Sequence, residues 1–288
     1  MKVQPGCYNC IKHQLDMLSE AIGRDVRHRE RILAELTDLT RQMVKRSTPP
    51  EMASQYYRIF ERETGISDPF RREKMLSTEL ALQMLPELRK AVGTGEGAFE
   101  RAVLLAIGGN IIDYGATPDF SLDGVEKKIL QVLDFGYDHS AMDELRRRVE
   151  TADKIVYILD NCGEAVIDRL LIELFPQKIT VAVRGRAILN DVTREDAVAS
   201  GLDFVPVVDT GDNTPGVSLK TSSSEFVAAL RSADLVIAKG QGNFESLAED
   251  FRDRPAFYLL RTKCDVICAQ LGAKLNSIQI IGRNLDRD

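Results

Sequence analysis

Residues 154–164 read KIVYILDNCGE, an apolar run that ends in an acidic and an amide side chain. A short, continuously apolar run rich in Ile and Val is typical of a strand buried on both faces of a parallel sheet. Five similar runs follow, most of them separated by helical spacing, and they span residues 179–183, 204–208, 235–238, 256–260 and 278–281. This alternation predicts a doubly wound, mainly parallel α/β sheet.

The first half of the chain has a different pattern. Its apolar residues recur at helical spacing, as in Ile32 and Leu36, and strand-like runs are nearly absent. One of these helices is expected to end at Pro86, because proline breaks the helical hydrogen-bond ladder. The sequence therefore predicts an all-helical region over residues 1–150 and a Rossmann-like α/β domain over residues 151–288 that carries the functional site.

Composition excludes several classes of protein. Hydrophobic residues make up 44% and charged residues 28% of the 288-residue chain, which argues against disorder or a coiled coil. No apolar run reaches the roughly 18 residues that span a bilayer, and no secretion signal is apparent at the N-terminus. We therefore expect a cytoplasmic protein with no membrane partner. The net charge of −6 argues against a nucleic-acid partner.

Polar residues follow four of the predicted strands. Ligands of an open α/β sheet lie beyond the carboxyl ends of its strands, so residues at these positions converge on one edge. The relevant stretches begin at Asp160, Asn190, Lys239 and Arg261. The sequence therefore predicts one binding site built from four strand ends.

Asp160, Asn161 and Asp191 are candidate ligands of a divalent cation. Their oxygens are hard donors with no histidine or thiol pair nearby, which suits Mg²⁺ or Mn²⁺ better than zinc. Asp and Asn after a strand are also common helix caps, and Asp191 could instead cap a helix begun at Thr193. Four converging strand ends favour the metal interpretation.

The residues that follow the other predicted strands suit the binding of a phosphate group. Lys239 and Lys263 supply positive charge, and Gly240 and Gly242 let backbone N–H groups approach an anion where a helix begins. Together with the cation ligands, these residues predict a site for a phosphorylated small molecule.

Four motifs resemble those of a known family. They are DNxGE at 160–164, NDVT at 190–193, KGQGNFE at 239–245 and RTK at 261–263, and GNIID at 109–113 matches the family's helical part. Over nearly its whole length the chain resembles the metal-dependent damage-control phosphatases, formerly domain of unknown function eighty-nine. The RTK form and the Cys7-x-x-Cys10 pair resemble the shorter, mainly prokaryotic branch.

The resemblance implies roles for individual residues. Asp160, Asn161 and Asp191 would hold the ion, and Asn243 and Lys263 would contact the substrate phosphate. Further residues are implied in substrate binding, namely Glu164, Lys239, Gly240, Gly242, Glu245, Arg261, Asn110 and Asp113. The resemblance also implies a helical N-terminal region packed on a doubly wound sheet.

These features predict a phosphatase that uses Mg²⁺ or Mn²⁺ to hydrolyse small phosphorylated metabolites, such as sugar phosphates or damaged phospho-metabolites. Asp160, Asn161, Asp191 and Lys263 are its expected catalytic residues. The in-line nucleophile is either water bound to the ion or Asp160 itself. The alternatives are a carboxyl methyltransferase using S-adenosylmethionine, which a missing glycine-rich turn after the first strand disfavours, and a non-catalytic metal-binding scaffold. A homodimer is the default assembly.

The odd number of cysteines, five, does not indicate a disulfide framework. Cys7 and Cys10 have the spacing of half a zinc site or a redox pair, and Cys264 and Cys268 share one helical face. If the N-terminus folds back over that helix, four thiols could meet; otherwise these are buried or reduced thiols. The histidines are expected at surface positions, and they are His13, His28 and His139.

Overall fold

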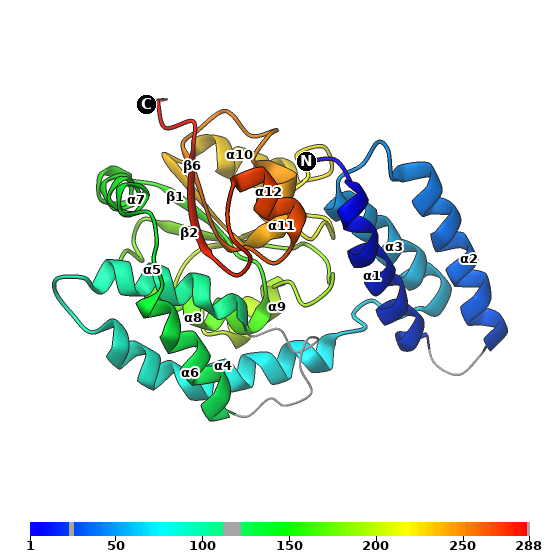
Figure 1. Cartoon of the computed structure of the whole chain (residues 1–288), viewed down its shortest axis with the longest axis horizontal. Coiled ribbons are helices and arrows are strands. Elements are labelled where there is room, and N and C mark those ends of the chain that lie inside the picture. Colours follow the sequence, from blue (N-terminus) through cyan, green and yellow to red (C-terminus); the bar gives the residue numbers. More distant parts are fainter. Residues whose placement is uncertain (23–25, 112–121, 287–288) are drawn as a thin grey trace.

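A six-stranded sheet forms the centre of the molecule (Figure 1). The computed structural model describes residues 1–22, 26–111 and 122–286. In chain order the strands are β1 (Ile155–Ile158), β2 (Ile179–Val183), β3 (Val207–Asp209), β4 (Leu235–Lys239), β5 (Ala256–Arg261) and β6 (Ile278–Arg283). Their order in the sheet is β3-β2-β1-β4-β5-β6, and only β6 is antiparallel to its neighbour. The predicted doubly wound, mainly parallel sheet is therefore confirmed.

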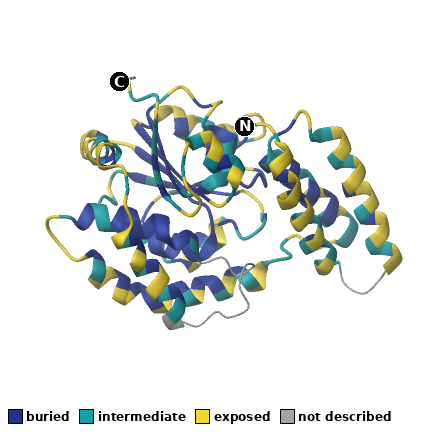
Figure 2. Cartoon of the chain, viewed as in Figure 1, coloured by how far each residue is buried: buried dark blue, intermediate teal, exposed yellow. Residues whose placement is uncertain are grey.

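Helices cover both faces of this sheet. The helical layer over one face contains α4 (Arg71–Val92), α5 (Ala98–Gly108), α6 (Leu122–Leu130), α7 (His139–Thr151), α8 (Cys162–Ile172) and α9 (Arg194–Ala199). The other face packs against α10 (Ser224–Ser232), α11 (Gly240–Leu247) and α12 (Asp265–Leu271). Alternate strand residues face opposite sides, so Tyr157 joins the first layer and Ile158 the second. The central strands β1 and β4 are accordingly buried along their length (Figure 2).

The first three helices form a group of their own beside the sheet (Figure 1). They are α1 (Tyr8–Ala21), α2 (Val26–Met43) and α3 (Pro49–Thr64), and their apolar faces share a separate hydrophobic cluster. Ile188, from the loop after β2, inserts into that cluster. Short 3-10 helices complete the described elements, namely η1 (Pro5–Cys7), η2 (Gly109–Ile111) and η3 (Gln131–Asp134). None of the helices described is long and apolar enough to cross a membrane.

Two sequence expectations about element ends were wrong. Helix α4 does not end at Pro86 but continues through it to Val92. Its buried residues Leu85 and Leu88 lie on both sides of the proline and pack into the core, which offsets the roughly 3 kcal/mol that an interior proline costs. The third strand begins at Val207 rather than residue 204, because Pro206 lacks the N–H that a ladder needs.

Candidate functional site

The loops after β1 and β2 pair with each other and so bring three predicted ligands together. The backbone N–H of Val192 donates to the carbonyl oxygen of Asp160 at 3.0 Å, and Asn161 and Asp191 form an isolated antiparallel bridge. Asp160 also follows β1, which pairs with both β2 and β4, the point where the strand order reverses. Ligands of doubly wound sheets bind at this point.

Asn161 occupies the N-cap position of α8, but its side chain makes no capping bond. Its Nδ2 instead donates to Asp160 Oδ2 at 3.1 Å and to Glu164 Oε2 at 3.4 Å, which leaves the amide oxygen out of these bonds. Helix α9 is capped by Thr193, whose side chain and that of Asp196 form a capping box. The alternative that Asp191 caps this helix is therefore wrong.

Gly240 makes room for the Asp160 carboxylate. A Cβ atom at Gly240 would lie 1.9 Å from Asp160 Oδ2, and the residue has a φ of 76°, which favours glycine. Gly242 also packs closely, because a Cβ there would lie 2.5 Å from the carbonyl oxygen of Pro215. These contacts explain both glycines without a phosphate; that their N–H groups bind one stays a prediction.

Lys239 points into the protein interior and not toward a bound anion, contrary to the sequence expectation. Its ammonium group is fully buried and donates to Glu164 Oε1 at 2.6 Å, Asp168 Oδ1 at 2.7 Å and the Ala106 carbonyl oxygen at 2.8 Å. All three N–H donors of the lysine are thus used inside the protein. Burial lowers the pKa of Lys239, but the two carboxylates outweigh it and the net shift is upward.

Asn243 is likewise occupied within the protein and does not contact the cavity. Its Nδ2 donates to the carbonyl oxygens of Lys239 at 2.6 Å and Leu159 at 3.2 Å, and its Oδ1 accepts from Arg184 Nη2 at 3.2 Å. Arg184 in turn donates through Nε to Asp191 Oδ2 at 2.7 Å. Asn243 thus joins Arg184 to two strand ends, and its contact with a substrate phosphate stays a prediction.

The buried network has more negative than positive charge. Four carboxylates share two buried cations, and the members are Asp160, Glu164, Asp168, Asp191, Lys239 and Arg184. Burial raises the pKa of Asp160 well above its usual range, and the charges of Asp191 and Glu164 raise it further. Two negative charges are left in excess when every group is ionised. A divalent cation fits this donor set, because it would balance that excess.

A cavity of about 210 Å³ opens above these ligands. Its walls are Gln14, Pro49, Pro50, Asp160, Asn161, Leu189, Asn190, Asp191, Pro215, Gln241, Gly242, Glu245 and Lys263. Lys263 is exposed, and its charge acts against the upward shift of the Asp160 pKa. The cavity therefore has carboxylates at its base and an ammonium group on its rim.

The other predicted substrate residues fall into three groups. Glu164 and Asn110 are buried behind the cavity, where Asn110 Nδ2 donates to Glu164 Oε2 at 2.7 Å. Arg261 is not among the lining residues and instead donates through Nε to the Asn276 carbonyl oxygen at 3.1 Å. Asp113 lies outside the described residues. Among the described members of the predicted substrate-binding set, only Gly242, Glu245 and Lys263 line the cavity.

Sequence reasoning missed two members of the buried network. Asp168 lies one helical turn after Glu164, and this i, i+4 spacing was a signal that both carboxylates share one face of α8. Arg184 directly follows β2, the position at which the other polar residues were sought. His13, expected at an ordinary surface position, is exposed but lines a second cavity next to the first.

The cysteines do not form a four-thiol metal site. The N-terminus does fold back on α12, since a Cβ at Gly6 would lie 2.6 Å from Val266 Cγ2. Across the described ranges, however, no group of three or more His, Cys, Asp or Glu side chains is arranged to hold a metal. The proposed cation set has two carboxylates, with Asn161 as its third donor. A redox role for Cys7, which is buried, and Cys10, which is exposed, stays a prediction.

Polar residues beyond the ends of its parallel strands place the protein in the class of open α/β proteins whose small-molecule site lies at the carboxyl ends of the strands. A comparison of the sequence with models of protein families identifies one family within this class. The damage-control phosphatase ARMT1-like domain matches residues 3–278, and the chain belongs to this family. The resemblance found in the sequence is thereby confirmed.

Individual relatives agree with this assignment. The chain is 34% identical to a damage-control phosphatase of Pyrococcus horikoshii, with 94% of each chain covered. It is 32% identical to an uncharacterized protein of Methanocaldococcus jannaschii, over 98% of this chain and 96% of that one. A crystal structure of a DUF89-family protein from P. horikoshii superposes with a TM-score of 0.88 at 32% identity, covering 99% of both chains. Family and named relatives together support a phosphatase role.

Proposed function

We propose that this protein is a divalent-metal-dependent phosphatase that hydrolyses small phosphorylated metabolites. The excess of buried negative charge beneath the cavity carries the proposal. Asp160 and Asp191 lie at the cavity base with one buried arginine between them, while Lys263 lies on the rim. This arrangement suits a cation below and a phosphate above, and the family assignment supports the phosphatase class.

Each residue of the site would have a distinct role in the reaction. Asp160, Asn161 and Asp191 would hold Mg²⁺ or Mn²⁺, which when bound supplies a Lewis acid for a phosphoryl oxygen. Lys263 attracts the phosphate and offsets charge that develops on it. Arg184 orients the Asp191 carboxylate through its 2.7 Å bond, so that the ligand does not have to reorganise during the reaction.

The nucleophile is water or the Asp160 carboxylate. Asp160 Oδ2 accepts from Asn161 Nδ2 at 3.1 Å, a bond that fixes one oxygen and leaves the other, Oδ1, 3.9 Å from Arg184 Nη2. A carboxylate so held is suited either to ligate or to attack. Rapid quenching followed by mass spectrometry distinguishes them, because only attack by Asp160 leaves a phosphorylated aspartate.

Phosphate release from a panel of phosphorylated metabolites, run with Mg²⁺, Mn²⁺ and chelator, tests the proposal. We expect Asp160→Asn and Asp191→Asn each to lower metal-dependent turnover by about 10²–10³-fold, the usual loss when a group that stabilises developing charge is removed. Asp265→Asn is the matched control, because Asp265 is exposed close to Lys263 in sequence and does not line the cavity. Wild-type turnover in both site variants would show the assignment to be wrong.

The same measurements separate the two alternatives. A scaffold would be stabilised by Mn²⁺ in thermal melting but would release phosphate from no member of the panel. A methyltransferase would bind S-adenosylmethionine in calorimetry, although the turn after β1 carries Asp160 and Asn161 rather than glycines.

A further inference from the structure

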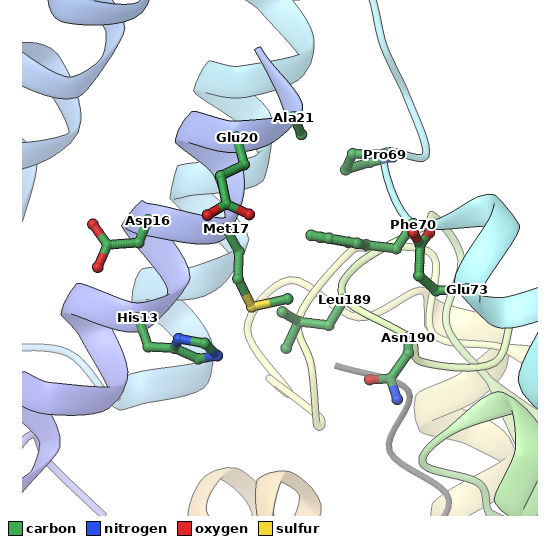
Figure 3. Close-up of a pocket in the computed structure, with 10 residues that line it drawn as sticks. All are labelled: His13, Asp16, Met17, Glu20, Ala21, Pro69, Phe70, Glu73, Leu189 and Asn190. Carbon is green, nitrogen blue, oxygen red and sulfur yellow. The ribbon is translucent and has the colours of Figure 1, made fainter. Parts of the chain in front are cut away.

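A second cavity, of about 430 Å³, lies between α1 and the start of α4. Its size is within the usual range for a small-molecule pocket. The lining residues are His13, Asp16, Met17, Glu20, Ala21, Pro69, Phe70, Glu73, Leu189 and Asn190, and Figure 3 shows them as sticks. We name this space the α1–α4 pocket.

The α1–α4 pocket adjoins the proposed phosphate site. Leu189 and Asn190 line both cavities, and Asn190 directly precedes the predicted ligand Asp191. A phosphate ester bound below Lys263 therefore has space for its alcohol portion on the side of α1. The two cavities together have room for both halves of a phosphomonoester.

One face of α1 supplies half of the pocket wall. His13, Asp16, Met17 and Glu20 recur at i, i+3, i+4 and i+7, the spacing of one helical face. A different face carries Ile11 and Leu18 into the hydrophobic cluster of the first three helices. Helix α1 is thus held by its apolar face and presents a mixed polar face to the pocket.

The charge of the pocket wall is negative. Glu20 extends from α1 over Met17, and Glu73 extends from α4 beside the ring of Phe70 (Figure 3). Within the described part of the chain neither glutamate forms an ion pair with a basic side chain. A second anionic group on the substrate would meet the like charge of these glutamates, whereas hydroxyl or amine groups would find acceptors.

We infer that the α1–α4 pocket receives the leaving alcohol and selects phosphomonoesters whose alcohol is uncharged and hydroxyl-rich, or cationic, over those with a second anionic group. This inference rests on the proposed phosphatase function. Met17, Phe70 and Leu189 supply apolar contact for the carbon skeleton, and Glu20 and Glu73 set the charge preference. The two glutamates determine specificity and do not line the phosphate site.

A matched pair of phosphate esters tests the preference. Glycerol 3-phosphate and 3-phosphoglycerate differ by a hydroxymethyl group in place of a carboxylate, so their comparison isolates charge. Each is measured as a competitive inhibitor of metal-dependent p-nitrophenyl phosphate hydrolysis. We expect glycerol 3-phosphate to bind about 10-fold or more tightly, and the Glu20→Gln/Glu73→Gln double variant to reduce that ratio to about threefold or less.

Glu79→Gln is the matched control. Glu79 is an exposed residue of the same helix as Glu73 and lines neither cavity, so the ratio should stay at the wild-type value. Equal inhibition by both esters, inhibition by neither, or an unchanged ratio in the double variant would each overturn the inference while p-nitrophenyl phosphate is still hydrolysed. Failure of the wild-type protein to hydrolyse p-nitrophenyl phosphate with any divalent ion would overturn the proposed function and this inference with it.

Discussion

The base of the phosphate site and the α1 wall of the neighbouring pocket are held in different ways. At the base, Lys239 is fully buried and its three donors have partners at 2.6–2.8 Å. On the wall, His13 and Glu20 are exposed and belong to a helix anchored by its opposite face. A buried ammonium group whose donors are all bonded has one arrangement, whereas exposed side chains adjust. In the proposed function, the chemistry is thus built on the buried part and recognition of the alcohol on the exposed part.

Two lysines provide the sharpest test of this difference. Lys239→Met should lower the free energy of unfolding by about 3–5 kcal/mol, because Glu164 and Asp168 would be buried without their cation. Lys263→Met should change that free energy by about 0.5 kcal/mol or less, since the side chain is exposed. Urea unfolding of both metal-free variants measures these values.

Activity should rank the same two variants differently. Lys263→Met should retain its fold yet lose about 10²-fold in kcat/KM, because the phosphate loses a positive charge on the cavity rim. If Lys263→Met unfolded as readily as Lys239→Met, the contrast between the buried base and the exposed side chains around the cavities would be incorrect.

A pair of glycines tests how closely the base is packed. Gly240→Ala should displace the Asp160 carboxylate, because the new Cβ would lie 1.9 Å from Oδ2, and turnover should fall about 10-fold or more. Gly272→Ala is the control, since its φ of 62° is similarly positive but no atom lies within 4 Å of the added Cβ. That variant should lose about 1 kcal/mol of stability from backbone strain alone and keep its turnover. Equal turnover losses in both variants would contradict the packing argument.

The smallest expected effect is a pH dependence that originates at Asp168. Burial raises the pKa of Asp168 to about 7, with Lys239 acting in the opposite direction. The folded pKa therefore exceeds the unfolded value of about 3.9, so this contribution to stability is complete below about pH 4 and is lost as the pH rises through about 7. Thermal melting in the presence of chelator should show that the free energy of unfolding falls between about pH 5 and pH 8. Asp168→Asn should make this fall about 1 kcal/mol smaller. Asp265→Asn, an exposed control, should follow the wild-type profile.

Most of the sheet could be predicted because buried parallel strands appear in the sequence as short, continuously apolar runs. Residues 154–159 and 235–238 were placed within a residue of β1 and β4, and their order along the chain implied that Asp160 and the Lys239 segment share one sheet edge. The α4 boundary could not be predicted in this way, because packing on α8, which is remote in sequence, overrides the local signal of Pro86.

The direction of Lys239 was missed although the sequence contained a signal for it. Leu235 and Ile237 face the α4–α8 layer, and Lys239 has the same strand parity, so it points beneath the sheet edge rather than into the cavity. Asn243 had no comparable signal, since its partners Arg184 and Leu159 come from separate strands. The last residue of a strand thus keeps the alternating side-chain direction of that strand. The direction of a side chain in the following helix depends instead on tertiary contacts.

Helix α4 reaches from the pocket wall to the sheet core. Glu73 stands in its first turn, Lys74 beside it pairs with Asp196 at 2.5 Å, and the remainder packs along α8, whose first turn carries Glu164. A tilt of α4 would therefore disturb the wall of the α1–α4 pocket and the buried carboxylates at once. Helix α1 also lines the first cavity, through Gln14, but it carries no member of the buried charged network, so new substrate preferences are more accessible to evolution and to engineering through its exposed face than through α4.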